Sequence, residues 1–232
     1  MSLNNGIKIF LRRLKRSLRY IYTKLKVSLN REYKISLSEF YIINKVEVEE
    51  GYSTQTSEQV LLLKKIINEN KINNLLEVGF NAGHSAELFL SSSSCDMISF
   101  DIGEHKYHKM GKSYIDQKFP HRHTLILGDS KETLPQFILS NPDKKFDMIF
   151  IDGGHDYNTV KSDLLNCRKL SHDNTIVIMD DTIYKKEMRL NYNIGPTEVW
   201  LEAIENNIIK EISKIQFCIG RGMSWGKYVS LK

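Results

Sequence analysis

The chain has 232 residues, 41% of them hydrophobic, and a formal net charge of +5, which suits one α/β domain with an extension. Its three cysteines form no C-x-x-C pair, so we expect a reducing compartment and a cytoplasmic protein rather than a disulfide framework. No apolar run approaches the roughly 20 residues that span a bilayer, and basic residues interrupt the only early hydrophobic stretch, so we expect no secretory signal.

Residues 1–30 form a distinct basic segment, which we expect to be a helical extension of a domain over residues 31–232. They contain no acid and eight basic residues: Lys8, Arg12, Arg13, Lys15, Arg16, Arg19, Lys24 and Lys26. Without these eight, 25 basic residues face 28 acidic residues, a net charge of −3. This mildly acidic remainder argues against a nucleic-acid groove on the main domain.

The same segment has an apolar residue at every third or fourth position, which predicts an amphipathic helix. The residues in phase are Ile7, Leu11, Leu14, Leu18, Ile21 and Leu25. Three interpretations remain open for residues 7–29. The stripe packs on the domain or on a partner chain, it lies on an anionic membrane surface, or it belongs to a transit peptide.

After an irregular stretch over 34–52, short apolar runs alternate with helical patterns. The strands expected are 74–78, 97–101, 124–127, 146–151 and 175–179, and the helices are 57–70, 82–91, 107–118, 131–139 and 157–170. This alternation predicts right-handed βαβ units and a parallel sheet. Pro196 then opens a helix over 197–206, and strands over 209–218 and 224–231 are close enough to form an antiparallel pair.

Each of the five parallel strands ends at or near a carboxylate. The residues are Glu77, Asp101, Asp129, Asp152 and the pair Asp180 and Asp181. A single acid in such a place is explained by helix capping. Five on one edge of a sheet indicate a ligand site, because ligands bind beyond the carboxyl ends of parallel strands.

The turn that follows the first strand predicts a nucleoside-like ligand. Gly79 and Gly83 allow a ligand to approach the backbone, Asp101 can accept hydrogen bonds from two ribose hydroxyls, and Asp129 can hold an amino group of a base. The spacing G-x-x-x-G, with Glu77 before it, differs from the dinucleotide pattern G-x-G-x-x-G, and no phosphate-cradling G-x-x-x-x-G-K-[ST] occurs.

The segments "LLEVGFNAGHSA", "FDIG", "LGDS", "FDMIFIDGGHDYNTVKSDL" and "IVIMDDT" together resemble class I S-adenosylmethionine-dependent methyltransferases. The most similar subgroup ends its fourth strand with D-G-x-H-x-Y and includes small-molecule and sugar O-methyltransferases. The resemblance covers about 53–232. It implies a Rossmann-like, seven-stranded, mostly parallel sheet with helices on both faces and an antiparallel C-terminal hairpin.

The resemblance also implies S-adenosylmethionine as the cofactor. Glu77, Gly79 and Gly83 would face its methionine part, Asp101 its ribose, and Asp129 with Ser130 its adenine. The full set of expected cofactor contacts is Glu77, Gly79, Phe80, Asn81, Gly83, Ser85, Asp101, Ile102, Asp129, Ser130 and Asp152.

The acids at the ends of the fourth and fifth strands indicate how the acceptor hydroxyl is held and activated. Asp152, Asp180 and Asp181 offer oxygen ligands for Mg²⁺ or another divalent cation, which would hold an acceptor hydroxyl near the methyl donor. His155 is the candidate general base. The alternatives are that Asp152 binds the cofactor or caps a helix, that Asp181 caps a turn, and that His155 is structural.

These patterns favour O-methylation of a small hydroxylated acceptor such as a sugar or glycan. An N- or RNA methyltransferase and a non-catalytic cofactor-binding module are the alternatives.

Overall fold

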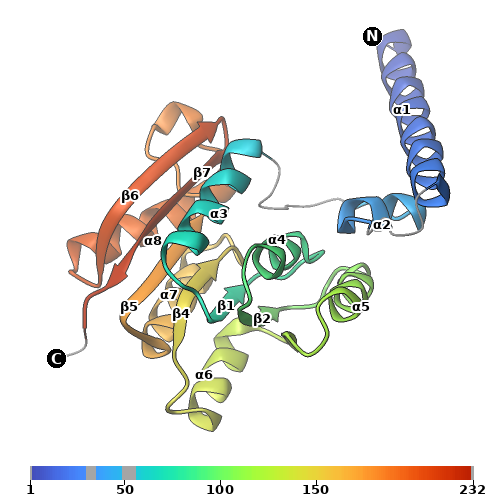
Figure 1. Ribbon diagram of the computed structural model, residues 1–232. Coiled ribbons are helices and arrows are strands. Elements are labelled where there is room, and N and C mark those ends of the chain that lie inside the picture. Colours follow the sequence, from blue (N-terminus) through green and yellow to red (C-terminus); the bar gives the residue numbers. More distant parts are fainter. Residues whose placement is uncertain (1, 30–34, 49–55, 231–232) are drawn as a thin grey trace. The chain divides into compact units, whose positions relative to one another are not determined.

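The computed structural model describes residues 2–29, 35–48 and 56–230, and the chain divides into two compact units, Met1–Glu50 and Gly51–Lys232 (Figure 1). Part of the irregular stretch over 34–52 lies outside the described residues. None of the helices within these ranges is long and apolar enough to cross a membrane.

The first unit contains two helices, α1 (Ser2–Leu29) and α2 (Leu37–Ile43). The amphipathic helix predicted within residues 1–30 is present as α1. A capping box of Ser36 and Glu39 begins α2, as expected where a serine hydroxyl and a glutamate satisfy free backbone donors. The two helices pack on each other, and Thr23 of α1 is buried.

The second unit is built on one seven-stranded sheet, with the strand order β3-β2-β1-β4-β5-β7-β6. Strands β1 to β5 run parallel, and β7 is antiparallel to both β5 and β6. The strands are β1 (Asn74–Val78), β2 (Asp96–Asp101), β3 (His123–Leu127), β4 (Phe146–Ile151), β5 (Ser171–Asp180), β6 (Ile209–Cys218) and β7 (Arg221–Tyr228). This confirms the predicted sheet and its C-terminal hairpin.

Helices cover both faces of this sheet. They are α3 (Ser57–Glu69), α4 (His84–Ser92), α5 (His108–Lys118), α6 (Ser130–Ser140), α7 (Tyr157–Lys169) and α8 (Ile194–Glu205), and two short 3-10 helices, Lys186–Met188 and Asn191–Asn193, precede α8. Alternate residues of the strands divide the core. Ile149 belongs to the cluster that includes residues of α6, α7 and α8, whereas its neighbour Phe150 packs edge-on against Phe89 of α4.

Two strands differ from the prediction by more than two residues. β5 begins at Ser171 instead of residue 175, because the Thr175 hydroxyl takes part in the pairing where the register shifts. It accepts from the His172 N–H at 2.8 Å and donates to the Phe146 carbonyl at 2.6 Å. β7 begins three residues early because the hairpin turns over two residues, with Gly220 at a φ of 71°.

Candidate cofactor and acceptor site

The turn between β1 and α4 has a shape that requires glycine. Gly79 has a φ of 103°, and a Cβ there would lie 2.0 Å from the carbonyl oxygen of Asp152 at the end of β4. Gly83 has a φ of 87° and precedes the first residue of α4, and a Cβ there would meet the ring of Phe80 at 2.8 Å. The turn therefore brings the backbone close to β4 and places the start of α4 directly after it.

Glu77 lies beneath this turn and is fully buried. Its carboxyl accepts hydrogen bonds from Ser85 of α4 and from Ser99 of β2, the latter at 2.6 Å. Burial raises the pKa of Glu77 to about 7, and the hydrogen bonds from the two serine hydroxyls limit this increase. Ser85 thus contacts Glu77, and this pair links β1, β2 and α4 directly below the candidate methionine site.

The Asp101 carboxylate, at the end of β2, accepts hydrogen bonds from the backbone of two loops, the one after β1 and the one after β2. Its Oδ2 accepts from the Asn81 N–H and its Oδ1 from the Gly103 N–H, both at 2.7 Å. A carboxylate oxygen has room for more than one donor, so the Asp101 carboxylate can also accept from ligand hydroxyls. Ile102 beside it is 58% exposed and offers an apolar surface to a flat ring.

Phe80 has a different environment from the other residues expected to bind the cofactor. Its side chain is buried and stacks on the imidazole of His123, with the ring centroids 5.1 Å apart. Since the ring fills the core under the turn, only the backbone of Phe80 remains for a ligand. The sequence pattern gave no sign of this, because hydrophobic loop residues can face either the ligand or the core.

Asp129 acts as the N-cap of α6, which is the capping alternative considered for the strand-end acids. Its Oδ1 accepts from the Lys131 N–H at 2.9 Å, and its Oδ2 lies 3.5 Å from Lys131 Nζ. The preceding residue, Gly128, donates its N–H to the Asp101 carbonyl at 2.9 Å. Asp129 and Ser130 are therefore next to Asp101, at the neighbouring strand end.

The three remaining acids form one cluster at the ends of β4 and β5. Burial raises the pKa of Asp152 well above its usual range, and the charges of Asp180 and Asp181 raise it further. Burial likewise raises the pKa of Asp180 to about 6, and burial together with Asp180 raises that of Asp181. The charge of Arg221 opposes all three shifts, so this cation lies near the cluster.

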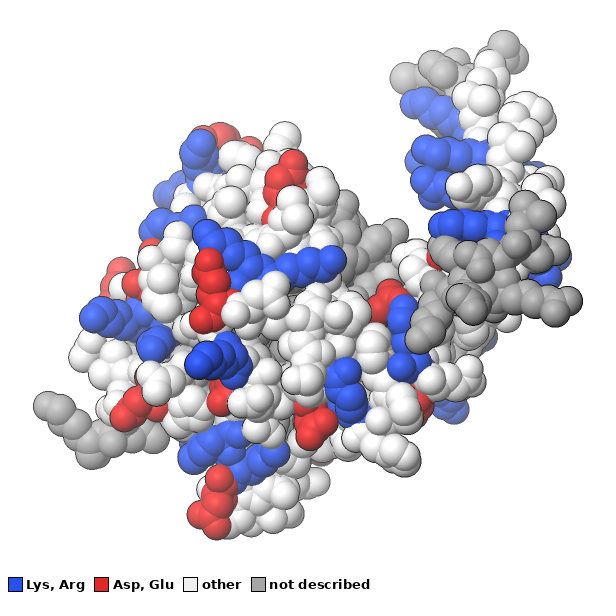
Figure 2. Space-filling view, viewed as in Figure 1, with Lys and Arg blue, Asp and Glu red and all other residues white. Residues whose placement is uncertain are grey.

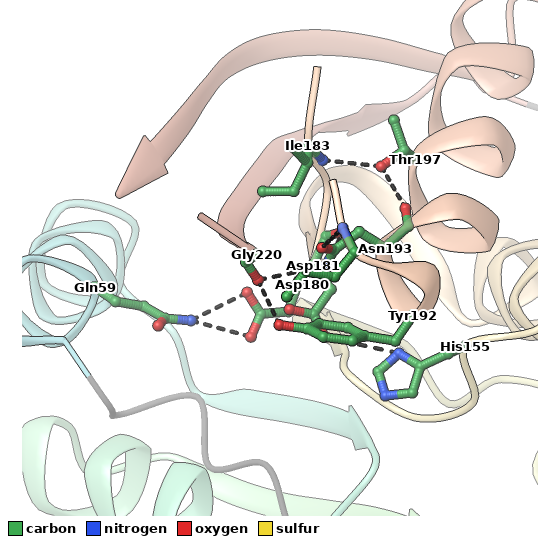
Figure 3. A network of polar contacts seen from close by, with 10 residues as sticks. Gln59, His155, Asp180, Asp181, Ile183, Tyr192, Asn193, Thr197 and Gly220 are labelled. Atoms are coloured by element: carbon green, nitrogen blue, oxygen red, sulfur yellow. Dashed lines mark hydrogen bonds and ion pairs between the residues drawn. The ribbon is translucent and has the colours of Figure 1, made fainter. Parts of the chain in front are cut away.

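Two members of the acidic cluster are already engaged by other side chains (Figure 3). Both carboxylate oxygens of Asp180 accept from Nε2 of Gln59 on α3, each at 3.0 Å. Oδ2 of Asp181 lies 3.7 Å from Nδ1 of His155. Within the described ranges, no group of three or more His, Cys, Asp or Glu side chains could hold a metal ion. The donor types suit a hard cation, but their arrangement does not fit one.

His155 sits over this cluster, on the loop after β4. Its side chain is 46% exposed, and its ring meets Tyr192 edge-on, with centroids 5.5 Å apart. Gly195 packs the start of α8 against this loop, since a Cβ there would lie 2.2 Å from the His155 carbonyl oxygen. The imidazole is thus positioned by neighbours and is also accessible from solvent.

Asn193 fixes the backbone around Asp181. Its Nδ2 donates to the Asp181 carbonyl at 3.2 Å and to the Gly220 carbonyl at 3.4 Å, while the Tyr192 hydroxyl donates to the same Gly220 carbonyl at 2.9 Å. Asp181 has a φ of 57°, a left-handed conformation that costs a non-glycine residue energy. These hydrogen bonds from Asn193 and Tyr192, which we call the clamp, therefore hold Asp181 in a strained position facing His155.

Sequence reasoning missed four residues of this site: Gln59, Tyr192, Asn193 and Arg221. They lie on α3, on the segment before α8 and on β7, outside every recognised motif. Only the tertiary fold brings these four residues to the ends of β4 and β5.

Comparison with known proteins agrees with this architecture. Residues 76–182 match a family model described as a methyltransferase domain. No curated protein matches the sequence.

Among solved structures, the fold is similar to an O-methyltransferase from Bacillus cereus in complex with S-adenosylhomocysteine, with a TM-score of 0.68, 18% identity and coverage of 88% of this chain and 96% of that one. It is also similar to the O-methyltransferase TomG from Streptomyces achromogenes, involved in tomaymycin synthesis and solved with S-adenosylmethionine, with a TM-score of 0.67, 15% identity and coverage of 90% and 96%. A methyltransferase from Podospora anserina bound to S-adenosylhomocysteine gives a TM-score of 0.62 at 15% identity, with coverage of 89% and 94%.

Residues 76–182 thus match a methyltransferase domain, and the second unit has the class I methyltransferase fold. The family resemblance inferred from the strand-end motifs is confirmed at this level.

Proposed function

We propose that the protein is an S-adenosylmethionine-dependent O-methyltransferase that acts on a small hydroxylated acceptor such as a sugar or glycan. The glycine turn, the Asp101 carboxylate and the exposed Ile102 lie in the order that the methionine, ribose and adenine parts of the cofactor require. Two O-methyltransferases of similar fold were solved in complex with S-adenosylhomocysteine and S-adenosylmethionine, which supports S-adenosylmethionine as the cofactor of this protein.

The observation that carries the proposal is one accessible histidine beside a buried carboxylate at the same sheet edge as the glycine turn. Oδ2 of Asp181 lies 3.7 Å from Nδ1 of His155, so we assign the proton of the neutral imidazole to Nδ1 and the role of the base to Nε2. In the reaction, the acceptor oxygen bonds to the methyl carbon, the carbon–sulfur bond breaks with its electron pair on sulfur, and Nε2 takes the hydroxyl proton. The enzyme supplies alignment and the base.

This assignment is tested with His155→Ala. Turnover of a responsive hydroxylated acceptor should fall by roughly 10²–10⁴, while cofactor affinity stays unchanged because the adenosine contacts lie on other strands. A matched control is His172→Ala. His172 also contacts a carboxylate, with its Nε2 3.1 Å from Oδ1 of Asp147. It lies near the start of β5, however, whereas the acidic cluster lies at the other end of that strand.

Parental turnover in a folded His155→Ala variant would contradict the role of His155. Cofactor binding without turnover of any hydroxylated acceptor would leave the non-catalytic binding module as the function.

Assistance by a divalent cation remains a prediction, and no step of the mechanism above depends on it. The cluster of Asp152, Asp180 and Asp181 supplies oxygen donors, whereas the hydrogen bonds from Gln59 compete for Asp180. Turnover lost in EDTA and restored by Mg²⁺ would support a metal, and full turnover in EDTA would eliminate it.

A further inference from the structure

The apolar stripe of α1 is exposed along its length. Its members are Ile7, Phe10, Leu11, Leu14, Leu18, Ile21, Tyr22 and Leu25, which are 46% to 66% exposed. At about 100° per residue, these eight positions fall within an arc of about 120°. The basic residues occupy the rest of the circumference, and Figure 2 shows them gathered along one side of α1.

The helix packs against α2 and the residues that follow α2 through another face. Thr23 is buried, Arg16 Nη1 lies 2.9 Å from Glu47 Oε2, and Lys45 Nζ lies over the Tyr20 ring, 5.6 Å from its centroid. On the helical wheel, these three α1 positions lie opposite the centre of the apolar stripe. Packing within this unit therefore orients α1 with the stripe outward.

We infer that the apolar stripe of α1 binds the surface of an anionic lipid bilayer, with the helix lying in the interface. Lys8 and Lys15 border one edge of the stripe, and Arg13 and Lys24 border the other. This arrangement places positive charge at headgroup level on both sides of an apolar face. Since no described helix can cross a membrane, the binding is peripheral.

Charge favours lipid over a second copy of the chain as the occupant. A second α1 would bring the same eight basic residues and no acid. Two stripes that face each other would then place like charges along both edges, which weakens helix pairing. An anionic membrane offers the opposite charge to the same edges.

The test is sedimentation of the full-length chain with phosphatidylcholine vesicles that contain or lack phosphatidylserine. Binding is expected only to the anionic vesicles. It should weaken as salt rises from about 0.01 M to about 1 M, because the Debye length falls from about 30 Å to about 3 Å.

Leu14→Gln with Leu18→Gln should lower the affinity about tenfold or more by removing apolar contact, while glutamine preserves the helix. The matched control is Ile9→Gln with Val27→Gln. These residues are also exposed, at 52% and 36%, but they project from the basic side of the same helix, so binding should be retained.

Three results would overturn the inference. The first is an absence of binding to anionic vesicles at low salt. The second is an equal loss of binding in both double variants. The third is a lipid-free dimer, seen by sedimentation velocity, that only the Leu14 and Leu18 substitutions dissociate, which would assign the stripe to a second copy.

Discussion

Asp101 gives the sharpest test of the cofactor site, because its carboxylate is the proposed acceptor for both ribose hydroxyls. Replacing it with alanine removes the acceptor for the N–H groups of Asn81 and Gly103 and the proposed acceptor for the ribose hydroxyls. Hydrogen bonds to a charged group contribute about 1.5–3 kcal/mol each. Loss of both ribose contacts should cost about 3 kcal/mol, which raises Kd for S-adenosylmethionine about a hundredfold.

Asp101→Asn should give a smaller effect, about tenfold in Kd, because one oxygen remains as an acceptor while the amide NH₂ opposes one of the two donors. Asp96→Ala is the matched control. Asp96 begins the same strand and is exposed, at the end away from the turn, so affinity should stay at the parental value.

Isothermal titration calorimetry measures the affinities, and circular dichroism with thermal melting shows whether each variant is folded. Asp101→Ala should also melt lower, because two backbone donors lose their acceptor. A folded Asp101→Ala variant that binds S-adenosylmethionine with parental affinity would refute the ribose assignment.

Three further substitutions probe stability and positioning. Gly79→Ala should lower unfolding free energy by about 3 kcal/mol, given φ of 103° and the 2.0 Å approach to Asp152; an unchanged melting temperature would contradict this. Burial raises the pKa of Asp163 from 3.8 to about 7. At a pH between these two values, the folded state keeps a proton that the unfolded state has released, so the stability of the parental protein falls as pH rises. The Asp163→Asn variant lacks this titration. It should therefore be stabilised relative to the parent more at about pH 8 than at about pH 5, by on the order of 3 kcal/mol. A pH-independent difference in chemical denaturation would oppose that. Asn193→Ala should slow turnover but preserve cofactor affinity, since it releases the Asp181 backbone; parental kinetics would count against the clamp.

The parts of the fold that sequence predicted best are those with local causes. β1 and β4 have the predicted bounds because each is a short apolar run that ends at a carboxylate and a turn. β5 was predicted too short because Asp173 and Asn174 interrupt the apolar pattern. There the side chain of Thr175 supports the strand start through bonds to His172 and Phe146, which residue type alone does not reveal.

The position of the candidate site followed from topology, but the partner of each side chain did not. Parallel strands bring Glu77, Asp101, Asp152 and Asp180 to one edge whatever their neighbours are. The orientation of Asp180 depends on Gln59, which lies 121 positions away in sequence. Such a contact leaves no periodic or local signature, because it arises only when α3 covers the sheet.

The acidic cluster shows why a pattern of carboxylates alone underdetermines chemistry. Three buried acids can lower their mutual repulsion by binding a cation, by retaining protons or by approaching a basic side chain. The sequence is the same in all three cases. Here the raised pKa values of Asp152 and Asp181 and the nearby charge of Arg221 supply two of these solutions from within the chain. His155 lies beside Asp181, with Nδ1 3.7 Å from Oδ2, so His155→Ala tests the base while treatment with EDTA tests the cation.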